Sequence, residues 1–254
     1  MKKAVIITIL SSFVSSFLII NSAAHADDSV TSPKNRARIH TELGANYFSR
    51  TQYAIALDEL REALSADNRY APAYGIMGLV YMELKEEKPA EDNFRRALEL
   101  APADSEIHNN YGWYLCTRKR YDEALTQFNT ALGNPLYSTP ERALTNAGIC
   151  SLQANKVEQA QGYLEKSLKL QPNQAQTLTE LGKIYYQQGR YFEARTLVER
   201  FFEQNQVTAE ALWLGVRVAR KQNNKDAEAS YALQLRRLFA NAPETQLLLQ
   251  GKFE

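Results

Sequence analysis

The sequence contains few of the residues that carry metal or nucleophilic chemistry. It has two cysteines and three histidines in 254 residues. Cys116 and Cys150 lack the C-x-x-C spacing of a zinc site, so no metal site is expected. No G-x-S-x-G, Walker A or G-x-G-x-x-G motif occurs. The sequence therefore shows no set of acid, base and nucleophile typical of an active site. We therefore expect no catalytic residues, no cofactor and no small-molecule substrate.

An excess of charge of one sign is also missing. The formal net charge is +1, whereas nucleic-acid-binding proteins usually carry a basic excess or stripe, so a nucleic-acid partner is not expected. Turn-forming residues are scarce, with 11 glycines and 8 prolines, while apolar residues make up 44%. That composition favours helices around a sizeable core.

Only one long apolar run occurs, and it lies at the N-terminus. Lys2 and Lys3 precede an uncharged stretch over residues 4–20, and Ala24-His25-Ala26 matches an A-x-A cleavage site. These features predict a signal peptide over residues 1–26 and export to the periplasm. The alternative is an uncleaved membrane anchor. Residues 27–36 are expected to form a flexible N-terminal segment.

The rest of the chain repeats with a period of 34 residues. Glycines recur at this period with one two-residue insertion and a final step of 33, and an alanine follows each glycine by twelve residues. Four residues after each alanine comes a large or branched apolar side chain. The glycines are Gly44, Gly78, Gly112, Gly148, Gly182 and Gly215, and the apolar residues are Leu60, Phe94, Phe128, Leu164, Val198 and Tyr231.

This pattern resembles the tetratricopeptide repeat, a helix–turn–helix unit of 34 residues. The unit over residues 71–104 fits best. We predict an all-α, right-handed superhelical solenoid of six such repeats over residues 37–240, followed by a C-terminal tail or capping segment over residues 241–254. The predicted units are 37–70, 71–104, 105–138, 141–174, 175–207 and 208–240.

Solenoids of this kind bind extended or helical segments on a concave face that is lined mainly by the first (A) helix of each repeat. The A helices lack the Lys, Asn and Arg set that grips a peptide carboxylate in some tetratricopeptide domains. Usual repeat geometry instead predicts a largely apolar partner-binding groove, although any one of its residues could be covered by a neighbouring helix. The predicted groove residues are Phe48, Leu79, Met82, Trp113, Ile149, Leu152 and Tyr186.

The two cysteines are predicted to form a disulfide. An even pair of cysteines in an exported protein more often forms a bridge than two free thiols. Cys116 and Cys150 lie on the predicted A helices of the third and fourth units, which pack side by side. The 34-residue loop between them would contribute about 3–4 kcal/mol in the chain-entropy model.

Three stretches of sequence indicate which family of repeat proteins the chain resembles. They are NNYGWYLC (residues 109–116), the insertion GNPLYSTPERALTNAGICSL (residues 133–152) and the segment LWLGVRVARKQNNKDAEASYALQLRRLF (residues 212–239). With the six repeats, they resemble the PilW (PilF) family of type IV pilus biogenesis and stability proteins over essentially the whole exported chain. The most specific part is Asn134-Pro135-Leu136-Tyr137 followed by Asn-Ala-Gly.

The resemblance implies a non-enzymatic periplasmic protein, near the outer membrane, that supports assembly or stability of the secretin through which the pilus leaves the cell. Secretin subunits would be its partners, the protein itself would be a monomer, and twitching motility would depend on it indirectly. Family members typically carry a lipid-modified cysteine directly after the signal peptide. Here the first cysteine is Cys116, so no lipid anchor is apparent and a pilotin-like targeting role is open. The alternative is a periplasmic adaptor of another envelope machine, such as polysaccharide export or cell-wall synthesis.

Overall fold

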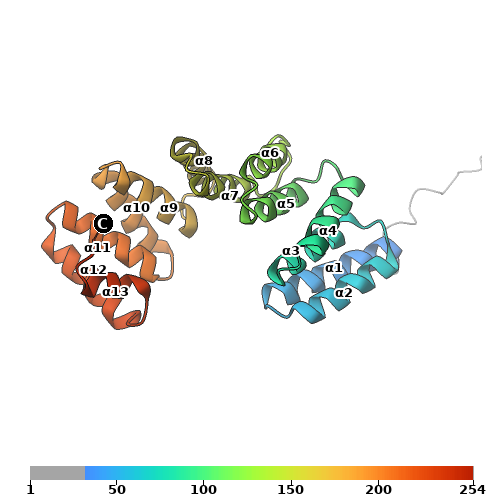
Figure 1. The fold of residues 1–254 in the computed structure, drawn as a ribbon, viewed down its shortest axis with the longest axis horizontal. Helices are drawn as coiled ribbons and strands as arrows, with labels where there is room; N and C mark the ends of the chain where they lie inside the picture. The colour runs from blue at the N-terminus through green and yellow to red at the C-terminus, as the bar shows by residue number, and fades with distance from the viewer. Residues whose placement is uncertain (1–31, 254) are drawn as a thin grey trace, which may run out of the picture.

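The computed structural model describes residues 32–253, and this part of the chain consists of 13 helices without strands (Figure 1). The predicted signal peptide over residues 1–26 lies outside the described residues. The helices are α1 (Pro33–Ser49), α2 (Tyr53–Ala66), α3 (Ala71–Glu83), α4 (Glu87–Leu100), α5 (Ser105–Thr117), α6 (Tyr121–Leu132), α7 (Pro140–Gln153), α8 (Val157–Leu170), α9 (Ala175–Gln187), α10 (Tyr191–Gln204), α11 (Ala209–Lys221), α12 (Lys225–Leu238) and α13 (Pro243–Leu249).

The first twelve helices form six antiparallel pairs, from α1 with α2 to α11 with α12. The odd-numbered member of each pair is the A helix and the even-numbered member is the B helix. Each A helix also packs against the A helix of the next pair, so α1, α3, α5, α7, α9 and α11 form one continuous layer. The predicted all-α tetratricopeptide solenoid is therefore confirmed, whereas the limits of the individual units stay a prediction.

The recurring glycines let the two helices of a pair approach closely. A β-carbon at Gly78 would lie 2.9 Å from the ring of Phe94, and one at Gly148 would lie 2.6 Å from Cγ of Leu164. The side chain sixteen residues after the glycine therefore sits directly on it. The fifth pair differs, because Val198 is the short residue at this position. There Leu214 of α11 fills the space, and its Cδ2 would lie 2.9 Å from a β-carbon at Gly182.

The turn inside each pair uses one residue in the left-handed region. These residues have φ between 55° and 75°, and only one of the six is a glycine. In the first pair the amide of Gln52 donates to the carbonyl of Tyr47 at 3.0 Å, which is the 6→1 bond of a Schellman motif. The turn residues are Thr51, Lys85, Lys119, Asn155, Gly189 and Asn223.

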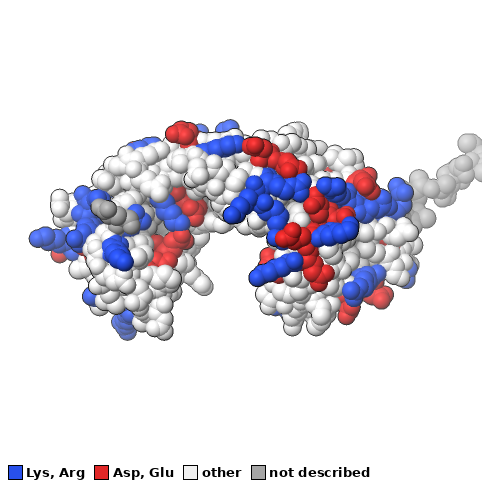
Figure 2. Space-filling model, in the orientation of Figure 1, with Lys and Arg blue, Asp and Glu red and all other residues white. Residues whose placement is uncertain are grey.

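The stack of pairs bends into an arch. In Figure 1, α5, α7 and α9 lie on the inner side of the bend, and their partners α6, α8 and α10 lie on the outer side. Figure 2 shows the same arch as a surface that is hollowed between its two arms. The layer of A helices is thus the one that faces the hollow along the middle of the molecule.

The two ends of the described chain depart from a simple repeat. We expected residues 27–36 to be flexible, but residues 33–36 form the first turn of α1. Ser32 Oγ accepts a hydrogen bond from the amide of Asn35 at 3.2 Å, and Pro33 occupies the first helical position, so the helix begins earlier than the repeat pattern indicates. At the other end α13 packs against α11 and α12. Within residues 32–253 no helix is long and apolar enough to cross a membrane.

Candidate partner-binding face

The predicted disulfide is present and joins two neighbouring A helices. Cys116 of α5 and Cys150 of α7 are bonded with their Cα atoms 5.7 Å apart. Both residues are buried, at 1% and 0% exposure. The bond spans the widened junction between the third and fourth pairs. It therefore fixes the spacing of the helices that carry Trp113 and Ile149.

The seven predicted groove residues all lie on A helices, from Phe48 on α1 to Tyr186 on α9. Six of them are half-buried, and only Tyr186 is classed as buried. Leu79, Met82 and Trp113 pack against the same hydrophobic cluster, which also contains both cysteines. The structure thus brings together the middle part of the predicted groove, on α3 and α5.

The remaining groove residues are distributed over other parts of the arch. Phe48 packs against the cluster of the first two pairs, and its ring lies 6.0 Å from that of Tyr53 at the start of α2. Leu152 packs against the cluster of the fourth to sixth pairs. Phe48 and Leu152 are therefore partly covered by neighbouring side chains.

Tyr186 departs from the expected open groove, because residues from the end of the chain cover it. It is 8% exposed, and its hydroxyl donates to the carbonyl oxygen of Phe253 at 3.4 Å. The guanidinium of Arg217 lies 4.2 Å from the centroid of its ring. Sequence reasoning placed Tyr186 in the groove, but could not show that residue 253 folds back onto α9.

Polar groups on the A helices lie beside the apolar side chains. Asn146 Nδ2 donates to Asn109 Oδ1 at 2.9 Å, which links α7 to α5. On α9, Lys183 pairs with Glu180 at 3.0 Å and with Glu210 of α11. Burial lowers the pKa of Lys183, but the hydrogen bonds and charges of Glu210 and Glu180 outweigh it, so the pKa is raised. Lys183 is therefore a charged, internally paired group on this face.

His40 and His108, the two histidines within residues 32–253, both contact the second helix of their own pair. His40 Nδ1 lies 2.7 Å from Glu59 Oε2 of α2. His108 Nδ1 lies 2.6 Å from Gln127 Oε1 of α6, and its Nε2 lies 2.9 Å from the carbonyl oxygen of Pro102. Within residues 32–253 no group of three or more His, Cys, Asp or Glu side chains is arranged to hold a metal.

A network of ion pairs ties the second helix pair to the third. Glu91 of α4 binds Arg95 at 2.7 Å and Arg120 at 2.9 Å. Burial raises the pKa of Glu91, but hydrogen bonds and charges from Arg120 and Arg95 outweigh it and lower the pKa. Charged side chains of both signs gather on this half of the molecule in Figure 2. Because the charges alternate, they cancel within the network.

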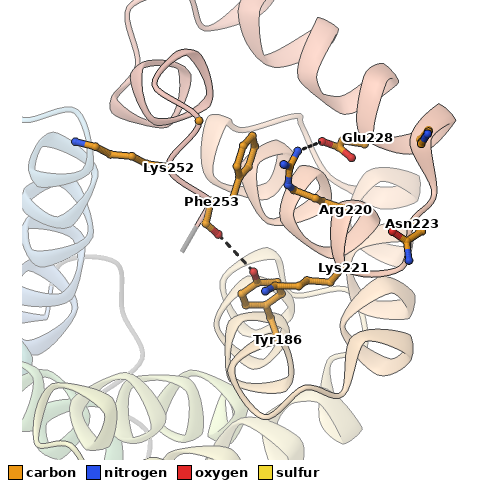
Figure 3. A pocket seen from close by; sticks show the side chains of 9 residues that line it. Tyr186, Arg220, Lys221, Asn223, Glu228, Lys252 and Phe253 are labelled. Carbon is orange, nitrogen blue, oxygen red and sulfur yellow. Dashed lines mark hydrogen bonds and ion pairs between the residues drawn. The ribbon is translucent and has the colours of Figure 1, made fainter.

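Sequence reasoning missed a second cluster of contact residues, which surrounds Phe253 (Figure 3). The cavity there has a volume of about 930 Å³ and is lined by residues of α9, α11 and α12 and by Gly251, Lys252 and Phe253. The ring of Phe253 stacks on Trp213 with centroids 5.6 Å apart. Trp213 and its neighbours lie in the family-like stretch over residues 212–239, but no local pattern there indicates a contact with residue 253.

Known proteins share this architecture and much of this sequence. Tetratricopeptide repeat models match residues 71–104, 93–126 and 151–214. The type IV pilus assembly protein PilF of Pseudomonas aeruginosa is 35% identical over 207 residues, which cover 82% of this chain and 82% of PilF. The chain belongs to the PilF family.

Solved structures of family members have the same fold. A structure of Pseudomonas aeruginosa PilF superposes with a TM-score of 0.79 at 33% identity, covering 87% of this chain and 99% of that one. A crystal structure of PilW, described as a widely conserved type IV pilus biogenesis factor, gives a TM-score of 0.75 at 32% identity, covering 84% and 98%. The PilF-family chain described here is thus a tetratricopeptide protein of type IV pilus biogenesis.

Proposed function

We propose that the protein is a non-enzymatic periplasmic scaffold that binds subunits of the outer-membrane secretin and promotes assembly or stability of the secretin multimer. The observation that carries this proposal is the apolar surface on the A helices of a fold shared with PilF and PilW. Half-buried apolar side chains on a hollowed face are typical of protein–protein binding sites. Periplasmic location is supported by the signal-peptide pattern over residues 1–26.

The middle of the arch is the part best suited to hold a partner segment. Leu79, Met82 and Trp113 share one hydrophobic cluster, and the Cys116–Cys150 bond braces the helices beside it. A braced face loses little conformational freedom on binding, so more of the contact energy is available for affinity. An extended apolar segment of a secretin subunit would lie across α3 and α5.

A deletion strain tests this function. Loss of the gene should reduce heat-resistant secretin multimers on an immunoblot and reduce surface pili, and expression of the wild-type chain should restore both. Unchanged multimers together with normal piliation would contradict the proposal and favour an adaptor role in another envelope machine.

The N-terminal mass of the protein purified from the periplasm tests the export part. Cleavage after Ala26 gives a chain that begins at Asp27. A retained N-terminus would instead indicate an anchored protein, and would move the proposed site of action to the inner membrane.

A further inference from the structure

We propose that the site formed by Trp213, Arg217 and Arg220 binds an aromatic residue within an acidic, extended segment of a partner protein, and that the chain's own Phe253 occupies it when that partner is absent. This site is separate from the apolar surface on α3 and α5, so the inference does not depend on secretin binding. It concerns the A helices α9 and α11 at the other end of the arch.

The contacts around Phe253 are those of a bound segment on a groove. Its ring stacks on Trp213 with centroids 5.6 Å apart, and the guanidinium of Arg220 lies 4.0 Å from its centroid. Its carbonyl oxygen accepts hydrogen bonds from Arg217 Nε at 3.2 Å and from the Tyr186 hydroxyl at 3.4 Å. The site thus recognises one aromatic side chain and one main-chain carbonyl, which any extended segment with an aromatic residue supplies.

Helix α13, which precedes Phe253, has anchoring contacts of its own in addition to those of Phe253. Helix α13 is held by Thr245, which is 2% exposed and whose hydroxyl donates to the carbonyl oxygen of Phe239 at 2.6 Å. Leu247 and Leu248 pack against the hydrophobic cluster that includes Trp213 and Leu235. Gly251, with φ at +67°, then redirects the chain toward α11. Phe253 can therefore leave its site while α13 stays in place.

The contacts that hold Phe253 are individually weak. The hydrogen bond from Tyr186 is long, and cation–π contacts at exposed sites contribute little binding energy. The guanidinium of Arg220 also forms an ion pair with Glu228 of α12 at 2.8 Å. A partner segment with additional contacts is therefore able to displace it.

The charge around the site specifies an acidic partner. Of the residues that the structure describes, Arg220, Lys221 and Lys225 line the cavity together with one acidic residue, Glu228. Among the described residues, Lys221 and Lys225 form no ion pair, so their charges are not neutralised within residues 32–253. Figure 3 shows Arg220 next to Phe253 and the side chain of Lys221 reaching toward Tyr186. Carboxylates on both sides of a bound aromatic residue would meet these cations.

The test uses the full exported chain and a fluorescein-labelled peptide, Asp-Gly-Asp-Phe-Glu, in fluorescence anisotropy. The tethered Phe253 segment competes at an effective concentration on the order of 1 mM, so with an intrinsic Kd of about 100 µM for that segment, Phe253→Ala should bind the peptide roughly tenfold more tightly than wild type. Leu249→Ala, a change at a 64% exposed residue just before the turn, is the matched control and should bind as wild type does. Adding Arg220→Ala to Phe253→Ala should remove the gain.

Two further readouts separate a displaceable occupant from a structural cap. The same peptide with Phe replaced by Ala should not bind Phe253→Ala, and peptide added to wild type should increase amide exchange at Gly251–Phe253. The proposal is overturned if Phe253→Ala binds the peptide no better than wild type, or if both peptides bind equally. A large fall in melting temperature for Phe253→Ala without any gain in peptide binding would likewise contradict it and identify Phe253 as a structural cap.

Discussion

Gly112 of α5 lies directly against Phe128 of α6, so closely that a β-carbon at Gly112 would lie 2.8 Å from Cε1 of the ring and 3.2 Å from the carbonyl oxygen of Ala124. The neighbour on one side is a fully buried ring and the neighbour on the other is backbone. Neither has room to move away. We expect Gly112→Ala to destabilise the protein by about 1–3 kcal/mol, the usual range for an overpacked core.

Gly162 provides the matched control, because it lies in the middle of α8 with nothing within 4 Å of its would-be β-carbon. Gly162→Ala should stabilise the protein by about 0.5–1 kcal/mol, since glycine is unfavourable inside a helix. Urea unfolding followed by circular dichroism measures both variants. Equal stability of the two would contradict the close-packing role of Gly112.

The turns between the two helices of each pair give a second prediction, in which introducing a glycine raises stability. Thr51 is a β-branched residue with φ at 59°, a conformation that costs such residues about 1–2 kcal/mol. Thr51→Gly should therefore raise stability, by about 1 kcal/mol. The equivalent Gly189 has φ at +75° and no neighbour within 4 Å, so Gly189→Ala isolates the backbone effect and should lower stability by a similar amount. Melting temperatures that do not move in opposite directions would refute this account.

Removal of the disulfide gives a third prediction. Cys116→Ser combined with Cys150→Ser should cost about 3–4 kcal/mol, because the bond closes a loop with a sequence separation of 34 residues. The loss should be reproduced when the wild-type protein is reduced with dithiothreitol, whereas the double variant should not respond to the reductant. A wild-type protein whose melting temperature is the same with and without reductant would contradict the bracing role.

The widened junction predicts a change of stability at alkaline pH. Tyr137 donates to Glu106 Oε2 at 3.1 Å, and burial, together with the nearby Glu106 carboxylate, raises its pKa to about 12. The unfolded chain loses this proton near pH 10. The folded state therefore binds more protons between pH 10 and 12, and its stability falls as pH rises through that window. Tyr137→Phe should show a shallower fall in the same titration, and parallel curves for the two proteins would rule out the effect.

The repeat pattern made most of the fold predictable. The glycine, alanine and large apolar positions place helix against helix, and Cys116 and Cys150 fall on neighbouring A helices as a consequence of the same register. At Val198 the repeat pattern does not predict the contact that forms. This side chain is too short to cover Gly182, and Leu214 of the next pair takes its place, a contact that depends on how two pairs stack.

The candidate binding face was predictable only where it follows the repeat. Leu79 and Trp113 occupy regular positions on A helices, so the repeat pattern predicts both the helices that carry them and the fact that they are half-buried. Tyr186 occupies a regular position too, but Phe253 and Arg217 cover it. The contact spans 67 residues of sequence and involves a segment without repeat periodicity. Such a contact is set by three-dimensional packing, and no local signal predicts it.

Capture of the secretin by groove variants tests the central claim most directly. Purified wild type, Leu79→Glu and Trp113→Glu would be compared as baits for the detergent-solubilised secretin, with Phe192→Glu as the control at a 65% exposed position on the B helix α10. The account predicts that the two A-helix variants lose capture at least tenfold while their helical circular dichroism is unchanged, and that the control captures secretin as wild type does. Capture that survives both Leu79→Glu and Trp113→Glu would show that the surface on α3 and α5 is not the binding site.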